Sequence, residues 1–405
     1  MKRLLFVDDE QHVLDSLRDA LRPYRRACKM VFATSGRDAL ARLSAAPFDV
    51  VVSDMRMPAM DGAALLGEVQ RLYPETVRIV LSGYTELAVA VRAASVAHLF
   101  LAKPCGSKEL MTTIERACGL RDLLADGALL KAIGAASTLP SVPEVYARLN
   151  EALADPATAA PDVAVILEQD MAMSAKVLQL ANSAFFQLDR SVTSVSEAVS
   201  YLGVPTLKAL ALSVSTFEAF EPATPVAGFS IETLQQHSLL VARIATRVAE
   251  DAGLPDDMLA PGLLHDVGKL VCATRLPTAF SASLASARRE QTPLFQVEQR
   301  QQQVTHAEIG AYLLGVWGLP HPLVEAVAHH HRPERVLSTE LTASVIIHVA
   351  DALAHEAAPI AGEPAPAVDE DHLQSIGFAD RLPSWRTLAA AEVDTPAPAG
   401  YAAVS

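Results

Sequence analysis

The sequence predicts an α/β domain built on a parallel sheet, followed by an all-α domain. Residues 1–120 alternate short runs of Val, Ile, Leu and Phe with stretches of helical pattern, as the βα units of a parallel sheet do. Over 136–355, apolar residues recur at helical spacing, and Pro and Gly separate the repeats. At 405 residues the chain is long enough for both domains.

The α/β domain is predicted to contain five strands with helices between them. The helical patterns include those of 12–21 and 36–43. The apolar runs that predict the strands lie at about 3–7, 29–33, 49–53, 77–81 and 98–102. Five such units predict a flavodoxin-like, five-stranded parallel sheet with helices on both faces.

Three further segments follow the α/β domain. Leucines at helical spacing over 121–135 predict a linker helix; it is a rigid coupling rod, part of a dimer seam, or an ordinary connection. The helices of 136–355 are predicted from apolar repeats at 163–167, 174–180, 207–217, 239–249 and 343–354. After 356, Ala, Pro, Glu and Asp predominate. We therefore expect 356–405 to be a partly disordered tail with one short helix near 385–391.

Composition and charge exclude several classes of protein. Apolar residues make up 51% of the chain and the formal net charge is −14, which argues against a general binder of nucleic acid or anionic membranes. The four cysteines are scattered and form no CxxC pair, as expected of reduced cytosolic thiols. The N-terminus is not a signal peptide, and no uninterrupted apolar run reaches the 18 residues of a membrane span. We expect a cytoplasmic protein.

Polar side chains follow four of the predicted strands of the α/β domain. They are Asp8 and Asp9, Asp54, Ser82, and Lys103. The carboxyl ends of parallel strands line one crevice, so these groups are predicted to meet there. A carboxylate such as Asp54 can attack a phosphoryl group, and a divalent cation such as Mg²⁺ offsets the charge between donor and nucleophile. Lys103 would then pair with a phosphoryl oxygen, and Ser82 would hydrogen-bond another.

Residues 1–120 resemble a response-regulator receiver domain. The matching motifs are Val7-Asp8-Asp9-Glu10, Ser53-Asp54-Met55-Arg56-Met57-Pro58, Asp61-Gly62, Leu81-Ser82-Gly83 and Phe100-Leu101-Ala102-Lys103-Pro104. The resemblance implies that Asp54 is the phosphoacceptor and that a sensor histidine kinase is the donor. It also implies that Mg²⁺ is held by Asp8, Asp9, Asp54 and the backbone carbonyl of Arg56. Phe100 would move inward when Ser82 shifts toward the phosphoryl group.

The helical domain contains an adjacent His265-Asp266 pair that can ligate a metal. The other candidate ligands are His237, His306, the triplet His329-His330-His331, and Asp351. Imidazole and carboxylate ligands suit Fe, Mn, Zn or Ni, and two such metals activate water for attack on a phosphodiester. We expect His321, His348 and His355 to be ordinary hydrogen-bonded histidines.

The order of these ligands resembles the HD phosphohydrolase superfamily. On that resemblance His237, His265, Asp266 and Asp351 are the basic ligands. In the cyclic-dinucleotide phosphodiesterase branch, His306, His329 and His330 would be the added ligands and Lys269 the lysine of the HDxGK motif. The chain departs from that branch after the histidines, where it reads His331-Arg332-Pro333-Glu334-Arg335 and lacks the Gly-Tyr-Pro signature.

The whole of 136–340 is more similar to the HDOD family, a regulatory offshoot of that superfamily. The matching stretches are Leu139-Pro140-Ser141-Val142-Pro143, Ile166-Leu167-Glu168-Gln169-Asp170, Val177-Leu178-Gln179-Leu180-Ala181-Asn182-Ser183-Ala184-Phe185, Ala198-Val199-Ser200-Tyr201-Leu202-Gly203, His306-Ala307-Glu308-Ile309-Gly310 and Trp317-Gly318-Leu319-Pro320. The resemblance implies a signalling or scaffold module in which the HD residues either bind Fe, Mn or Zn or are relics.

Together the resemblances predict a two-component response regulator that is a signalling protein rather than an enzyme. Phosphorylation of Asp54 would change contacts with downstream signalling proteins and promote a homodimer. One alternative is a phosphorylation-gated, metal-dependent HD-type phosphodiesterase acting on a cyclic dinucleotide. Another is a transcription factor, but no basic recognition helix is found and the acidic charge disfavours DNA binding.

Overall fold

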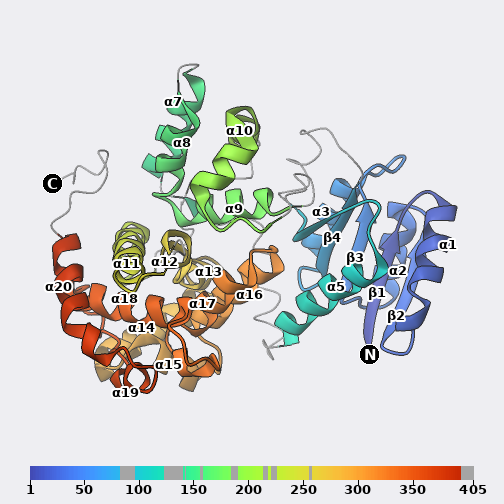
Figure 1. Ribbon diagram of the computed structural model, residues 1–405. Helices are drawn as coiled ribbons and strands as arrows, with labels where there is room; N and C mark the ends of the chain where they lie inside the picture. The colour runs from blue at the N-terminus through green and yellow to red at the C-terminus, as the bar shows by residue number, and fades with distance from the viewer. Residues whose placement is uncertain are drawn as a thin grey trace. The chain divides into compact units, whose positions relative to one another are not determined.

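The fold class predicted from the sequence is confirmed, because a five-stranded parallel sheet comes first and a helical region follows (Figure 1). The computed structural model describes residues 1–82, 96–122, 140–141, 143–155, 158–183, 190–212, 218–219, 226–254 and 258–393. The chain divides into two compact units. One contains 1–167, 172–220 and 312–320, and the other contains 168–171, 221–311 and 321–405.

The sheet of the first unit has the strand order β2-β1-β3-β4-β5, and every pair is parallel. Its strands are β1 (Lys2–Val7), β2 (Cys28–Ala33), β3 (Val50–Asp54), β4 (Val77–Ser82) and β5 (Leu99–Ala102), each within one residue of its predicted position at both ends. After β2 the chain returns to the other side of β1, so the direction of winding changes between β1 and β3. In open α/β sheets a crevice forms at this point, outside the carboxyl ends of the strands.

Four described helices accompany this sheet. They are α1 (Gln11–Ala20), α2 (Gly36–Ala45), α3 (Gly62–Leu72) and α5 (Ser107–Asp122), with a short 3₁₀ turn, η1, at Arg22–Tyr24. Leu4 and Phe6 of β1 pack in one cluster with Leu14 of α1 and Ile114 of α5. Leu5, between them, is also fully buried. Burial of successive residues requires cover on both faces, which explains why the strands read as continuous apolar runs.

Further helices of the first unit follow the sheet. Their bounds, with those of two short paired strands, are β6 (Pro140–Ser141), α7 (Pro143–Ala154), α8 (Ala160–Leu167), α9 (Met171–Ala181), α10 (Val195–Leu212) and β7 (Glu218–Ala219). Helix α10 is kinked at Gly203, whose φ of 73° lies in the left-handed region that glycine adopts without a Cβ clash.

The second unit is helical in its described part. Its elements, with α16 continuing into the first unit, are α11 (Ile231–Asp251), α12 (Leu259–Leu264), α13 (Val267–Arg275), α14 (Pro277–Glu290), α15 (Leu294–Gln302), α16 (His306–Val316), α17 (His321–His329), η2 (Pro333–Arg335), α18 (Ala343–Ala357), α19 (Glu370–Ser375), η3 (Ala379–Arg381) and α20 (Leu382–Val393). Helices α11 and α18 form the centre of its core.

The region after 356 differs from the loose tail that its composition predicts. Residues 358–393 are part of the second unit, and α20 packs against α11 and α18 (Figure 1). Leu382, Trp385 and Ala389, which are spaced to share one face of α20, are all buried in the core. The predicted short helix near 385–391 lies within α20, but the prediction of a loose tail is wrong for these residues, because three buried apolar side chains dock that helix on the core. Residues 394–405 lie outside the described part.

Trp385 is predicted to be essential for the stability of the second unit. Its side chain is fully buried, and its indole N–H donates a 3.0 Å hydrogen bond to Oδ2 of Asp251. We expect Trp385→Ala to lower the free energy of unfolding of this unit by about 3–5 kcal/mol, measured by chemical denaturation. Leu337→Ala is the matched control, because Leu337 is 99% exposed and should change stability by less than about 0.5 kcal/mol.

Two sequence predictions concern chain regions that the structure tests only in part. The predicted linker helix over 121–135 begins inside α5, which ends at Asp122, and the rest of it lies outside the described residues. Among the helices described, none combines the length and the apolar character needed to cross a bilayer.

Candidate phosphoacceptor site and candidate metal centre

The acidic and basic residues of the sheet meet at its carboxyl edge. Asp8 follows β1, Asp54 ends β3 and Lys103 follows β5. The Nζ of Lys103 lies 2.6 Å from Oδ2 of Asp8 and also donates to Oδ1 of Asp54. Asp9, the next residue after Asp8, is exposed. Two carboxylates therefore contact one ammonium, and the surplus negative charge suits a hard divalent cation such as Mg²⁺.

The Asp54 carboxylate is fixed in orientation but remains reachable. Its Oδ2 accepts a 2.6 Å hydrogen bond from the backbone N–H of Arg56, and its side chain is 14% exposed. Burial raises the pKa of Asp54, and the hydrogen bond and charge of Lys103 counter part of that rise. Burial lowers the pKa of Lys103, but its hydrogen bonds to Asp54 and Asp8 outweigh this and raise it. The ammonium is thus retained beside the carboxylate of Asp54.

The start of α3 packs closely against the end of β3, beside Asp54. Asp61 caps the helix by accepting a 2.8 Å hydrogen bond from the N–H of Ala64. Gly62 lies so close to β3 that a Cβ there would stand 2.1 Å from the backbone oxygen of Asp54. The Asp61-Gly62 motif therefore positions the loop that carries Asp54 and Arg56.

Of the two residues of the predicted switch, Ser82 and Phe100, the structure describes the side chain of Phe100 only. Phe100 lies on β5 and is 7% exposed. Ser82 is the last residue of β4, in register with Ala102 of β5, but the placement of its side chain is outside what the structure describes. The predicted coupling of Ser82 to Phe100 stays a prediction.

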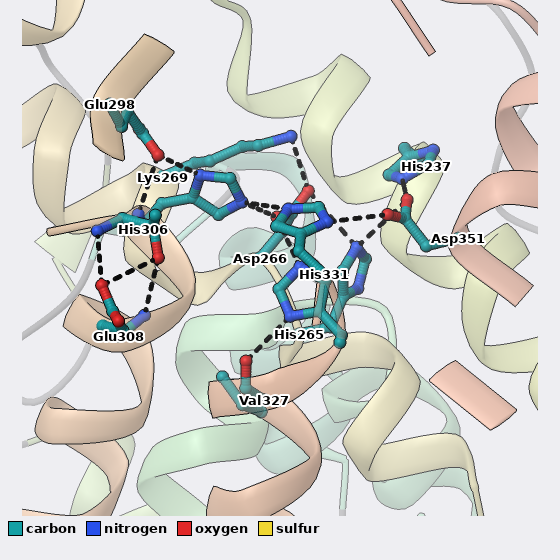
Figure 2. Close-up of polar contacts among 12 residues, drawn as sticks. His237, His265, Asp266, Lys269, Glu298, His306, Glu308, Val327, His331 and Asp351 are labelled. Atoms are coloured by element: carbon teal, nitrogen blue, oxygen red, sulfur yellow. Dashed lines mark hydrogen bonds and ion pairs between the residues drawn. The ribbon is translucent and has the colours of Figure 1, made fainter. Parts of the chain in front are cut away.

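The metal-ligand candidates of the second unit converge in two adjacent groups, most of whose members Figure 2 labels. His237 comes from α11, His265 and Asp266 from the junction of α12 and α13, and Asp351 from α18. The first group is His237, His265 and Asp351, and the second is Asp266, His306, His330 and His331; within each, the ligand atoms lie within 4.8 Å of one another. Residues more than a hundred positions apart in sequence thus share one buried centre.

In the first group, Asp351 lies between two imidazoles. Its Oδ1 is 3.0 Å from Nε2 of His237 and 3.7 Å from Nε2 of His265. The Nδ1–H of His265 donates to the backbone oxygen of Gly262 at 2.7 Å, and its Nε2 is buried without a hydrogen-bond partner. A backbone carbonyl that fixes the tautomer and leaves Nε2 free toward a carboxylate is the usual support of a metal-binding histidine.

In the second group, His306 lies between two carboxylates. Its Nε2 is 3.1 Å from Oδ1 of Asp266, and its Nδ1 is 2.7 Å from Oε2 of Glu298. His330 donates from Nδ1 to the backbone oxygen of Val327 at 2.8 Å, and its buried Nε2 has no hydrogen-bond partner. The Nε2 atoms of His331 and His306 are 3.0 Å apart. This geometry also fits a metal centre, because nitrogen and oxygen donors point inward while outer partners hold the rings.

The histidines of the centre differ in the direction in which their pKa values are shifted. Burial lowers the pKa of His330 to about 3, so this ring is neutral and its Nε2 can act as a ligand. Burial also lowers the pKa of His306, but Glu298 and Asp266 outweigh it and raise the value to about 9. Burial raises the pKa of Asp266, yet the ammonium of Lys269 and the imidazole of His265 hold it well below its usual range. Donors of this kind suit Fe, Mn or Zn.

The two groups include part of the predicted histidine triplet, and further residues support them. His330 and His331 belong to the second group, whereas His329, the last residue of α17, is in neither group. The sequence reasoning also missed Glu298, which lies on an amphipathic helix without any local signal. His355, expected to be an ordinary histidine, has its Nδ1 3.1 Å from Oδ1 of Asp351. His348 donates to the backbone oxygen of His330 at 2.8 Å and so supports that segment.

Gly268 allows α13 and α16 to approach closely beside the centre. Gly268 lies in the first turn of α13, where a Cβ would stand 1.8 Å from the backbone oxygen of His306. We expect Gly268→Ala to lower the unfolding free energy of the second unit by about 1–3 kcal/mol or more, measured by denaturation. Gly106→Ala is the control, since no atom lies within 4 Å of its added Cβ; equal stabilities of the two variants would contradict the close packing.

Lys269 is a component of the centre rather than a solvent-exposed lysine. Its Nζ is 2.8 Å from Oδ2 of Asp266 and 3.1 Å from Oε1 of Glu363. Burial lowers the pKa of Lys269, but Asp266 and Glu363 outweigh it and raise the value. The lysine therefore carries its charge at the edge of the proposed ligand set.

Comparisons with known proteins identify a family for each of two parts of the chain. The model of the response regulator receiver domain matches residues 4–115, and the model of the HDOD domain matches residues 139–333.

The similar proteins each cover part of the chain. An uncharacterized protein of Treponema pallidum is 25% identical over 220 residues, which are 53% of this chain and 43% of that protein. The transcriptional regulatory protein ZraR of Salmonella typhimurium is 33% identical over 167 residues, which are 40% of this chain and 36% of ZraR. Among solved structures, the MmoQ response regulator from Methylococcus capsulatus is 23% identical with a TM-score of 0.47, over 62% of this chain and 98% of MmoQ. The chain spans less than half the length of these two curated relatives.

Proposed function

We propose that this chain, in which a receiver domain is followed by an HDOD domain, is a response regulator whose Asp54 receives a phosphoryl group from a sensor histidine kinase. The observation that carries this proposal is the bridging of Asp8 and Asp54 by Lys103 at the carboxyl edge of the sheet. Mg²⁺ bound by Asp8, Asp9, Asp54 and the carbonyl of Arg56 would offset the charge between the carboxylate and the phosphoryl oxygens.

The residues of the site have separate roles in this transfer. An oxygen of Asp54 attacks phosphorus, the bond from phosphorus to the donor nitrogen breaks, and an acyl phosphate forms. Lys103, already held at Asp54, pairs with a phosphoryl oxygen as a mobile point charge. The N–H of Arg56 holds the second carboxylate oxygen, so the attacking oxygen keeps its direction. Ser82 and Phe100 would report the phosphoryl group to the face formed by β4 and β5.

We assign the output to the HDOD domain as a regulatory, protein-interaction module. Phosphorylation would bias its contacts with downstream signalling proteins or with a second copy of the chain, and direct DNA binding is not expected. The test is incubation with acetyl phosphate and Mg²⁺, followed by intact mass and sedimentation velocity. The expected result is one phosphoryl group per chain and a changed sedimentation coefficient. A phosphorylated protein with unchanged sedimentation and unchanged backbone hydrogen exchange in the HDOD domain would contradict the regulatory output.

A second candidate function is a metal-dependent phosphodiesterase that acts on a cyclic dinucleotide. The observation that favours it is the convergence of the two ligand groups around buried, unpartnered imidazole nitrogens, an arrangement able to hold two ions that activate a water. The missing Gly-Tyr-Pro segment counts against it. Hydrolysis of a cyclic dinucleotide by the metal-loaded protein, absent in His265→Ala, would establish this activity.

A further inference from the structure

A short segment between α18 and α19 crosses the edge of the candidate metal centre. It contains residues 358–363 and ends at Glu363, whose Oε1 lies 3.1 Å from Nζ of Lys269. The same Nζ lies 2.8 Å from Asp266, a member of the second ligand group. Glu363 is therefore the next anion outward from the centre along a single chain of charges.

Part of this segment lines two cavities of about 510 and 540 Å³. Ile360 and Ala361 line both cavities, and so do His237 and Thr233 on the opposite side. His237 belongs to the first ligand group. Movement of residues 358–363 outward would join the two cavities and open a single approach to the centre.

The second cavity is built to receive an anion. Lys269 and Arg288 both line it, together with Glu363. The guanidinium of Arg288 binds backbone carbonyl oxygens, with Nε 3.2 Å from Gly362 and one terminal nitrogen 2.6 Å from Gly228. None of the ion pairs found among the described residues includes Arg288. The cavity thus holds two cations, while Glu363 supplies the carboxylate opposite Lys269.

We propose that residues 358–363 form a lid over the metal centre, and that Glu363 holds it closed by taking the place of a phosphate-group ligand on Lys269. A phosphate group carries more negative charge than a carboxylate and can accept hydrogen bonds from Lys269 and Arg288 together. Its binding would release Glu363 and break the contacts of Arg288 with the lid. Glu363 therefore competes with phosphate for Lys269 while remaining part of the same chain. The inference depends on the proposed function in one respect, which is that the centre beneath the lid is the proposed metal site.

The test uses inorganic phosphate as the probe and the full chain with its metal content measured. Glu363→Gln keeps the size of the side chain but removes the charge that competes with phosphate. We expect its Kd for phosphate, measured by calorimetry, to be about tenfold lower than that of the unaltered protein, as the loss of one charge-assisted contact predicts. The matched control is Glu370→Gln. Glu370 also follows α18 and forms an ion pair, but its partner is Arg386, so this variant should leave the Kd unchanged.

Hydrogen exchange of the lid gives an independent measurement. In the unaltered protein, phosphate should speed backbone exchange of residues 358–363, and in Glu363→Gln exchange should already be fast without phosphate. Equal phosphate affinities in the two proteins, or a lid that exchanges equally in both, would overturn the proposal. Elemental analysis tests the lid and the metal centre separately. If the protein contains no metal but Glu363→Gln still changes phosphate affinity and lid exchange, the lid is supported and the metal centre is not.

Discussion

Asp54→Asn protein is expected to take up no phosphoryl group from acetyl phosphate in the presence of Mg²⁺. The amide lacks the nucleophilic, charged oxygen that the transfer requires, and it removes one ligand of the divalent cation. The fold should persist, because Lys103 keeps its 2.6 Å contact with Asp8 and the amide oxygen can still accept the hydrogen bond of Arg56. The measurement is intact mass with and without the phosphodonor.

The control for this experiment is Asp61→Asn. Asn is as good a helix cap as Asp, so α3 is retained, and the acidic pair of Asp8 and Asp54 is untouched. Asp61→Asn should be labelled to the same extent as the unaltered protein. Continued labelling of Asp54→Asn, at the rate of the control, would show that another residue is the acceptor.

The second large effect is expected at the HD pair. His265→Ala/Asp266→Ala protein should lose the Fe, Mn or Zn that the unaltered protein retains, up to two ions because there are two ligand groups. Each group loses one inward-pointing donor, and Lys269 loses its partner Asp266. Removal of metal by a chelator should lower the midpoint of thermal unfolding of the unaltered protein, since an ion that binds only the folded state stabilises it.

Two further variants make the metal result interpretable. His265→Gln removes the ligand without emptying the site, and its circular dichroism shows whether the helices remain folded. His321→Ala replaces an exposed histidine outside both groups and should keep the full metal content. If elemental analysis finds no metal in any of these proteins after expression in metal-supplemented medium, the HD residues are relics and the HDOD domain acts through protein contacts alone.

The arrangement of the candidate phosphoacceptor site was predictable because it depends on topology. In a parallel sheet every strand presents its carboxyl end at one edge, so Asp8, Asp54 and Lys103 had to meet once the strands were recognised. The structure adds what strand order cannot contain, such as the hydrogen bond from Arg56 to Asp54 and the close contact of Gly62. These depend on the local path of the loop after β3.

The candidate metal centre was predictable only in part. His265, Asp266 and Asp351 were identified from motifs, but the triplet at 329–331 follows no helical or strand periodicity once α17 ends at His329. Sequence spacing therefore could not decide which two imidazoles of the triplet turn inward, and the assignment by resemblance chose His329 rather than His331. The packing of α20 was missed for another reason, since Ala- and Pro-rich composition masked the spacing of Leu382, Trp385 and Ala389.

The position of Asp351 has a practical consequence for dividing the chain. The HDOD match ends at residue 333, but Asp351 lies on α18 and contacts His237 at 3.0 Å. A fragment that stops at the family boundary would lack one carboxylate of the first ligand group, the α18 half of the core and Trp385. Weak metal binding or poor folding of such a fragment would result from the truncation rather than from the domain itself. A fragment used in these assays should therefore extend to Val393.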